Sequence, residues 1–137
     1  GIQLPLAGQA TTTPPTRAAD GLAIQKRVVG AERVDAMYAS APADAQHFQR
    51  YLSANCFGDF LTRGAIDLPV RELLTFAMLV ALGGADPQVR GHVAANLNVG
   101  NDRAALLSVL TVLVPFIGYP RTLNGLAAVE AVIPGGE

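Results

Sequence analysis

The sequence predicts an all-α fold, and two features of its 137 residues support this prediction. Helix-start and helix-stop residues bracket most of the chain: Asp86-Pro87 and Asn101-Asp102 are typical of starts, and Gly83-Gly84 is typical of a stop. In addition, no two segments have the alternating pattern of a strand pair. The segment 106–117 is rich in Val and Leu, as a strand would be, but its length and its flanking caps favour a helix.

The expected elements follow an N-terminal arm. Residues 1–16 contain three prolines and a run of three threonines, so they are expected to form an extended arm outside a helical domain that spans residues 17–137. Pro42 and Pro120 suit the first turn of a helix, and Asp67 is placed to cap the helix that follows it. The expected helices cover residues 22–29, 32–38, 42–60, 70–82, 87–99, 102–118 and 120–133, with a kink at Pro115 in the sixth.

Composition and charge narrow the classes of partner. Half of the residues are hydrophobic, 15% are charged and the net charge is −1. So few charges favour burial of part of the surface against another subunit, and the helix 106–117, which is apolar almost all round, needs cover that a second copy of the chain would supply. Neither nucleic acid nor a membrane is an expected partner, because no basic patch is present and the apolar stretch 73–82 is too short to span a bilayer.

The single cysteine limits the redox chemistry that the protein can carry out. Cys56 is the only cysteine in the sequence, so an internal disulfide is excluded and a cysteine-built zinc site is not expected. No metal and no other cofactor is expected. A single free thiol fits a reducing compartment, and the cytoplasm is the expected location.

His92, in the middle of the expected helix 87–99, is the first candidate for chemistry. Histidine suits general acid or base catalysis near neutral pH. The alternative is a buried histidine whose polar groups are satisfied by one hydrogen bond. The other histidine, His47, lies among glutamines and is expected at the surface.

Three segments follow one another between Asn55 and Asn124: FGDFLTRGAIDLPVRELLTFAMLVALGG, GHVAANLNVGND and PFIGYPRTLNGL. In order and spacing they resemble the carboxymuconolactone decarboxylase family, which is related to alkylhydroperoxidase D. The resemblance implies an alkylhydroperoxidase D-like helical domain that assembles as a trimer or a hexamer. This expectation agrees with the apolar helix noted above.

The alkylhydroperoxidase branch of the family implies a glutamate, a Cys-x-x-Cys pair and a histidine four residues after the second cysteine. By this resemblance the histidine is His92, the glutamate lies near Glu72, and the two cysteine positions fall on Ala85 and Gln88. Neither of these two residues forms a thiolate, so a dithiol peroxidase cycle is not available there. Glu72 then has two interpretations: a site residue, or a solvated first-turn carboxylate favoured by the helix dipole.

The decarboxylase branch lacks the cysteine pair and resembles this chain in the FGD-x-x-x-R segment and the histidine helix. It implies that Asp59, Arg63 and His92 line a pocket, with Asn96 and Tyr119 as further substrate contacts. Loss of CO2 from a lactone acid leaves negative charge on an enolate; Arg63 can hold a carboxylate and His92 can move a proton. The alternatives are structural: Asp59 forms a salt bridge with Arg63 one turn later, or caps the turn that follows.

Three hypotheses about function follow. The first is a lyase or decarboxylase acting on a small carboxylated or lactone-like substrate, with His92 as acid/base, Arg63 as anion holder, and Asp59 or Glu72 orienting the others. The second is a thiol-dependent peroxidase that uses Cys56, which precedes the FGD segment; the alternative for this thiol is core packing. The third is a non-catalytic binding or scaffold oligomer.

Overall fold

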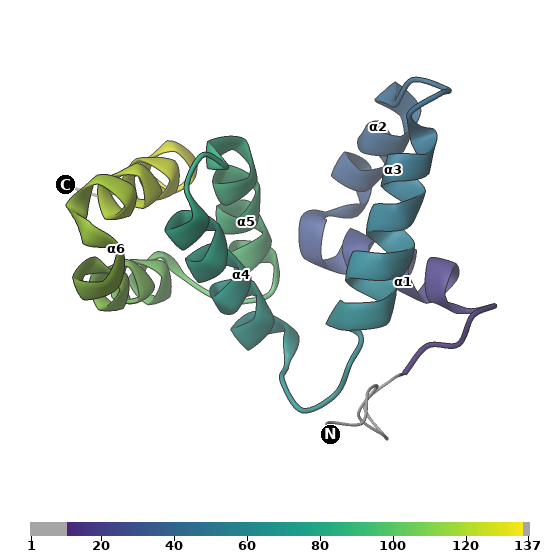
Figure 1. The fold of residues 1–137 in the computed structure, drawn as a ribbon, viewed down its shortest axis with the longest axis horizontal. Helices are drawn as coiled ribbons and strands as arrows, with labels where there is room; N and C mark the ends of the chain where they lie inside the picture. The colour runs from purple at the N-terminus through teal and green to yellow at the C-terminus, as the bar shows by residue number, and fades with distance from the viewer. Residues whose placement is uncertain (1–10, 136–137) are drawn as a thin grey trace. The chain divides into compact units, whose positions relative to one another are not determined.

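The computed structural model describes residues 11–135, and within that range every regular element is a helix (Figure 1). The all-α prediction is therefore confirmed for the described residues. The chain divides into two compact units, Gly1–Leu68 and Pro69–Glu137. Most of the expected N-terminal arm lies outside the described residues, and the part that is described ends in a turn at residues 14–16. The first helix begins at Arg17, five residues before the start of the expected helix 22–29.

The first unit contains three α-helices and one π-helix. Gly30 has a positive φ of 100° and lies between the first two helices, so the first helix ends at Val29, which confirms the end of the expected helix 22–29. The expected helix from Pro42 begins later, at Gln46, because a turn in which the Ala45 N–H donates to the Pro42 carbonyl comes first. The elements are α1 (Arg17–Val29), α2 (Ala31–Ser40), α3 (Gln46–Tyr51) and the π-helix η1 (Leu52–Leu61).

Close packing of α1 against η1 depends on two glycines. A Cβ atom at Gly21 would collide with the Ser53 carbonyl oxygen and would come within 2.7 Å of the Gly58 nitrogen. A Cβ atom at Gly58 would collide with the Arg17 carbonyl oxygen. Since these neighbours are backbone atoms, they cannot move aside as a side chain would. The glycine of the FGD segment is thus required by the fold of this unit.

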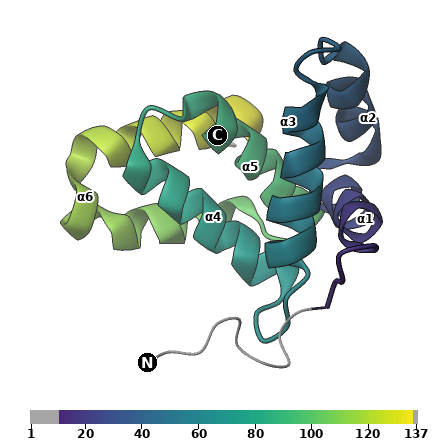
Figure 2. The same cartoon turned by 45° about the vertical axis from the view of Figure 1, so that its right-hand side comes forward.

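The second unit contains α4 (Leu68–Leu82), α5 (Asp86–Asn98) and α6 (Arg103–Val132), seen together in Figure 2. Asp102 caps α6, because its side chain accepts a hydrogen bond from the Ala105 N–H at 2.8 Å. Asp86 does not cap α5: the cap position is Ala85, and no side chain bonds to it. The core of this unit comprises Phe76, Val80, Val89, Val93, Leu106, Leu110, Ala128 and Val129.

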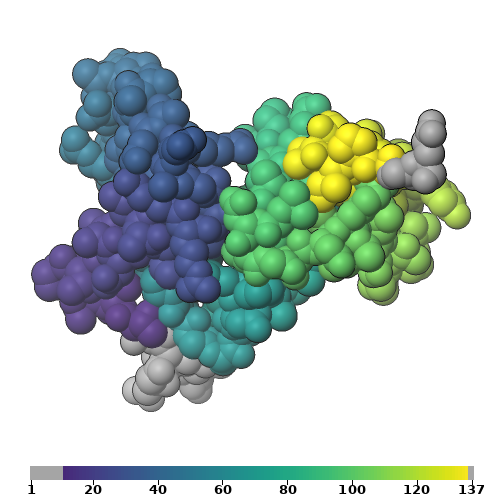
Figure 3. All heavy atoms as spheres, turned by 180° about the vertical axis from the view of Figure 1, so that it is seen from behind, coloured from purple at the N-terminus to yellow at the C-terminus, as the bar shows by residue number. Residues whose placement is uncertain are grey.

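The break predicted between the helices 102–118 and 120–133 is confirmed and lies at Gly118, whereas Pro115, where a kink was predicted, lies within the helical segment before it. Gly118 has φ 73° and ψ 170°, a conformation that is accessible essentially only to glycine. Pro120 favours a break just before it, because proline restricts the residue that precedes it and suits the first turn of a new helix. Arg103 at the start of α6 donates to the Ile133 carbonyl and pairs with Glu130, so the two ends of α6 lie side by side (Figure 3).

Among the described residues, α6 is the one helix long and apolar enough to cross a membrane by length and composition. Gly118 divides its 30 residues into segments 103–117 and 119–132. Each segment is shorter than the ~20 residues that a membrane-spanning helix needs. This division favours packing within a protein as the explanation for the apolar composition of α6.

Candidate active site

Glu72 of α4 and His92 of α5 form a hydrogen-bonded pair in the second unit. Nδ1 of His92 lies 2.7 Å from Oε2 of Glu72. The Glu72 side chain is fully buried, whereas a quarter of the His92 side chain is exposed. Because Glu72 occupies Nδ1, the other ring nitrogen, Nε2, is the one left for an incoming molecule. The solvated interpretation of Glu72 is wrong, since this carboxylate has no contact with water.

The buried carboxylate of Glu72 is only half satisfied. Its second oxygen, Oε1, is buried and has no hydrogen-bond partner. Burial of a carboxylate is costly unless it is paired and hydrogen-bonded, so the Glu72 side chain depends strongly on its one contact with His92. A carboxylate placed here fixes the orientation of the imidazole ring, as a carboxylate does for a histidine that acts as acid or base.

Two asparagines surround the backbone of this pair. Asn96 is fully buried, and its side-chain N–H group donates to the carbonyl oxygens of Glu72 at 3.2 Å and His92 at 2.7 Å. The side-chain N–H group of Asn101 donates to Oδ1 of Asn96 at 2.8 Å and to the Pro69 carbonyl at 2.8 Å. Asn96 was predicted to contact substrate; the structure instead engages its amide with the protein on both sides. Sequence reasoning assigned Asn101 only to a helix start. Its side-chain contacts with Asn96 and Pro69 were missed, because contacts made from a loop have no regular spacing in the sequence.

The residues of the FGD segment lie in the first unit, on or after η1. Asp59 accepts a bidentate hydrogen bond from Arg17 and a further one from Asn55 at 3.1 Å. The Arg17 guanidinium is the main cause of a lowered pKa of the Asp59 carboxyl; burial opposes it less strongly, and the Asn55 amide adds a smaller lowering effect. Arg17 was missed by sequence reasoning, because its partner is 42 positions away.

The remaining predicted residues occupy different surroundings. Arg63, which follows η1, and Cys56, within it, are both half-buried. Tyr119 follows the break at Gly118 in the second unit and is 68% exposed. His47 is exposed, as predicted, and its ring stacks on Phe48 with centroids 4.2 Å apart. The roles assigned to Arg63, Cys56 and Tyr119 stay predictions.

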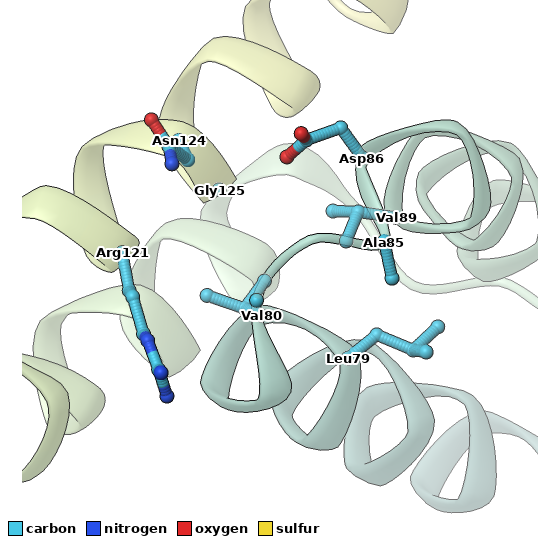
Figure 4. A pocket seen from close by; sticks show the side chains of 9 residues that line it. Leu79, Val80, Ala85, Asp86, Val89, Arg121, Asn124 and Gly125 are labelled. Atoms are coloured by element: carbon cyan, nitrogen blue, oxygen red, sulfur yellow. The ribbon is translucent and has the colours of Figure 1, made fainter.

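The positions that correspond to the cysteine pair lie at the start of α5. Ala85 lines a small cavity between α4, α5 and the second half of α6, with Asp86 and Arg121 also at its edge (Figure 4). The cavity has a volume of about 10 Å³, roughly the room for one water molecule. Gln88 is exposed. Neither position therefore supplies a thiol, and the cavity that Ala85 lines is too small for an organic substrate.

Within residues 11–135, no group of three or more His, Cys, Asp or Glu side chains is placed to hold a metal ion. A larger and strongly apolar groove, with a volume of about 460 Å³, lies between α4 and the first half of α6. Its lining residues are Leu73, Leu74, Ala77, Ala105, Ser108, Val109, Val112 and Leu113.

Comparison with known proteins identifies the class to which this helical chain with a buried carboxylate–histidine pair belongs. The chain is a member of the carboxymuconolactone decarboxylase family, whose model matches residues 46–131. It is also 27% identical over 112 residues to the 4-carboxymuconolactone decarboxylase of Acinetobacter baylyi. That match covers 82% of this chain and 83% of the relative. The family expected from the three sequence segments is confirmed.

Proposed function

We propose that the protein is a decarboxylase of small carboxylated lactones, in which His92 is the general acid/base and Glu72 orients and charges it. The observation that carries the proposal is the 2.7 Å contact between Nδ1 of His92 and the fully buried carboxylate of Glu72. Membership of the carboxymuconolactone decarboxylase family and the similarity to a 4-carboxymuconolactone decarboxylase support the choice of reaction.

The chemistry of this reaction needs one proton at carbon. The bond between the lactone carbon and its carboxylate breaks, CO2 leaves, and the electron pair of the bond remains as an enolate conjugated with the lactone carbonyl. Protonated His92 then delivers the Nε2 proton to carbon, and the ring regains a proton from solvent. Glu72 stabilises the imidazolium form through Nδ1–H, which makes the proton available when the enolate forms. The proposal requires no metal and no organic cofactor.

The anion-holding role of Arg63 and the contributions of Asp59 and Tyr119 stay predictions from the family resemblance. The peroxidase hypothesis rests on Cys56 alone, and treatment with peroxide followed by mass measurement of the intact protein tests it. The scaffold hypothesis is disfavoured by the exposure of a quarter of the His92 side chain, since a ring kept only for packing has no need of access to solvent.

The test uses 4-carboxymuconolactone as substrate, with disappearance of this carboxylated lactone and release of CO2 as readouts. His92→Gln is expected to reduce kcat by at least ~100-fold, the contribution typical of general acid–base catalysis. His47→Gln, which changes the exposed histidine, is the matched control and is expected to keep full activity. Wild-type turnover that survives in folded His92→Gln protein, as judged by circular dichroism, would contradict the proposal.

The predicted homo-oligomer, a trimer or hexamer, is retained as part of this proposal. Large apolar side chains on α4 and α6 support it: Met78 is 61% exposed, Val112 66% and Phe116 80% in the single chain. Apolar side chains concentrated on one surface are typical of subunit contacts.

A further inference from the structure

The amide of Asn96 joins the two helices that carry the Glu72–His92 pair. Its N–H group donates hydrogen bonds to the backbone carbonyl oxygens of Glu72 and His92, the two residues of the pair. One planar group therefore connects the backbone of α4 to that of α5 at the level of the carboxylate and the imidazole. Since Asn96 is fully buried, no water competes for these hydrogen bonds.

Asn101 determines which way the Asn96 amide faces. The N–H group of Asn101 points at Oδ1 of Asn96, so the amide of Asn96 must present its oxygen to Asn101 and its N–H group to the two carbonyls. In the reversed orientation, the N–H group of Asn96 would face the N–H group of Asn101, and the amide oxygen of Asn96 would face the carbonyl oxygens of Glu72 and His92. Asn101 is itself held by its bond to the Pro69 carbonyl at the start of α4, and its backbone N–H donates to the Asn96 carbonyl at 2.9 Å.

We propose that Asn96 and Asn101 are positioning residues, which set the distance and orientation of the Glu72–His92 pair through the backbone. They act on a carboxylate with a single hydrogen bond, so a small shift between α4 and α5 removes the only partner of a buried charge. The catalytic consequence rests on the proposed function, but the effect on the imidazole does not. Neither asparagine touches the substrate in this inference.

The first experiment compares four variants by steady-state kinetics with 4-carboxymuconolactone. Asn96→Asp keeps the shape of the side chain, but it replaces the N–H group with an oxygen that faces the carbonyl oxygens of Glu72 and His92. Asn101→Ala removes only the amide that orients the Asn96 side chain. Both are expected to reduce kcat by about 10- to 100-fold and to leave KM within a factor of three, since displacement of a catalytic group of about 1 Å has an effect of this order. Asn124→Ala, an exposed asparagine, and Val93→Ala, a destabilising core change in α5, are the controls.

The second experiment reads the imidazoles directly, through the ¹⁵N chemical shifts of the two histidine rings at alkaline pH. In wild-type protein, His92 is expected to be held with its proton on Nδ1, whereas the exposed His47 ring samples both tautomers. Asn101→Ala is expected to shift His92 toward mixed tautomers while His47 stays unchanged. It is the more conservative variant and keeps the test open if Asn96→Asp does not fold.

The two readouts separate the two proposals. Absence of wild-type turnover together with a His92 shift in the asparagine variants would overturn the proposed reaction and keep the positioning role. Wild-type ¹⁵N shifts and a wild-type kcat in folded Asn101→Ala protein would overturn the positioning role. An equal effect of Val93→Ala on the His92 ring would also overturn it, because general loosening of α5 would then be sufficient.

Discussion

Glu72 places a carboxylate in the interior with one hydrogen bond, and replacing its charge without changing its shape isolates what that charge does. We expect Glu72→Gln to reduce kcat toward 4-carboxymuconolactone by ~100-fold, because a neutral amide no longer stabilises the imidazolium of His92. The amide oxygen can still accept from Nδ1–H, so the fold is expected to be kept. Steady-state kinetics together with thermal unfolding measures both effects.

Glu32→Gln, a change of an exposed carboxylate in α2, is the matched control for Glu72→Gln and is expected to have wild-type kinetics. If Glu72→Gln also turns over substrate at the wild-type rate, the carboxylate does not assist His92, and its burial needs a purely structural explanation.

Asp59 provides a pH dependence of stability that can be assigned to one group. Its pKa in the folded state is lowered, chiefly by Arg17, so the ion pair contributes stability at pH values above the unfolded-state pKa of about 3.9 and loses it as the pH falls through the lower folded-state value. We expect Asp59→Asn to be less stable than the wild type in urea unfolding at pH 7. The difference is expected to disappear in strong acid.

The effect of Asp59→Asn is expected to be small and to decrease with added salt, because both partners are partly exposed. Asp44→Asn, at an exposed position before α3, is the control and is expected to follow the wild type at every pH. A gap between Asp59→Asn and the wild type that persists in acid would show that the side chain acts by packing and not by charge.

The sequence was sufficient to name both members of the Glu72–His92 pair, because each occupies a family position, but it left the environment of Glu72 open. Burial of this carboxylate depends on how α4 packs against α5 and α6, which no local pattern encodes. The same limit explains Asn101 and Arg17, whose contacts join residues 32 and 42 positions apart. Tertiary packing determined these features.

At the scale of elements, helix boundaries marked by glycine or by a side-chain cap were predictable. Gly30, Gly100 and Asp102 act locally, through a positive φ or a hydrogen bond within the first turn. The π-helix η1 was not predictable. A π-helix has wider turns than an α-helix, but over only ten residues the spacing of apolar side chains does not distinguish the two. At Gly58, η1 also packs closely against α1, a tertiary contact that the local sequence does not encode.

The break at Gly118 leads to a prediction about α6. Gly118→Ala is expected to destabilise the protein by about 1–3 kcal/mol, since a Cβ atom is poorly tolerated at φ 73° and ψ 170°. Crowding does not contribute, because the nearest atom to an added Cβ is 3.8 Å away. Urea unfolding measures the change.

Gly64→Ala, where an added Cβ has nothing within 4 Å and the backbone has no positive φ, is the control for Gly118→Ala. Wild-type stability of Gly118→Ala would contradict the backbone strain expected for a Cβ atom at this position.

At the scale of the whole molecule, the low charge and the apolar helix both predict self-association, and we propose that the surface for it lies on the second unit. Two exposed apolar side chains, Leu74 of α4 and Val112 of α6, line the groove of about 460 Å³ between these helices. In water an apolar surface of this kind is unfavourable, and a second copy of the chain would cover it.

The expected cytoplasmic location is untested and stays a prediction.

Phe116 tests the self-association, because it is the most exposed large apolar side chain among the described residues, at 80%. Light scattering coupled to size-exclusion chromatography is expected to give the mass of a trimer or hexamer for the wild type. Phe116→Asp places a charge where burial would leave it unpaired, at a cost of several kcal/mol per contact, so it is expected to elute as a monomer. Arg33→Gln, at an exposed position of α2, lowers the net charge by the same single unit and is expected to keep the wild-type mass. A monomeric wild type, or a Phe116→Asp protein of unchanged mass, would exclude this surface as the subunit contact, and the apolar side chains of α6 would need another partner.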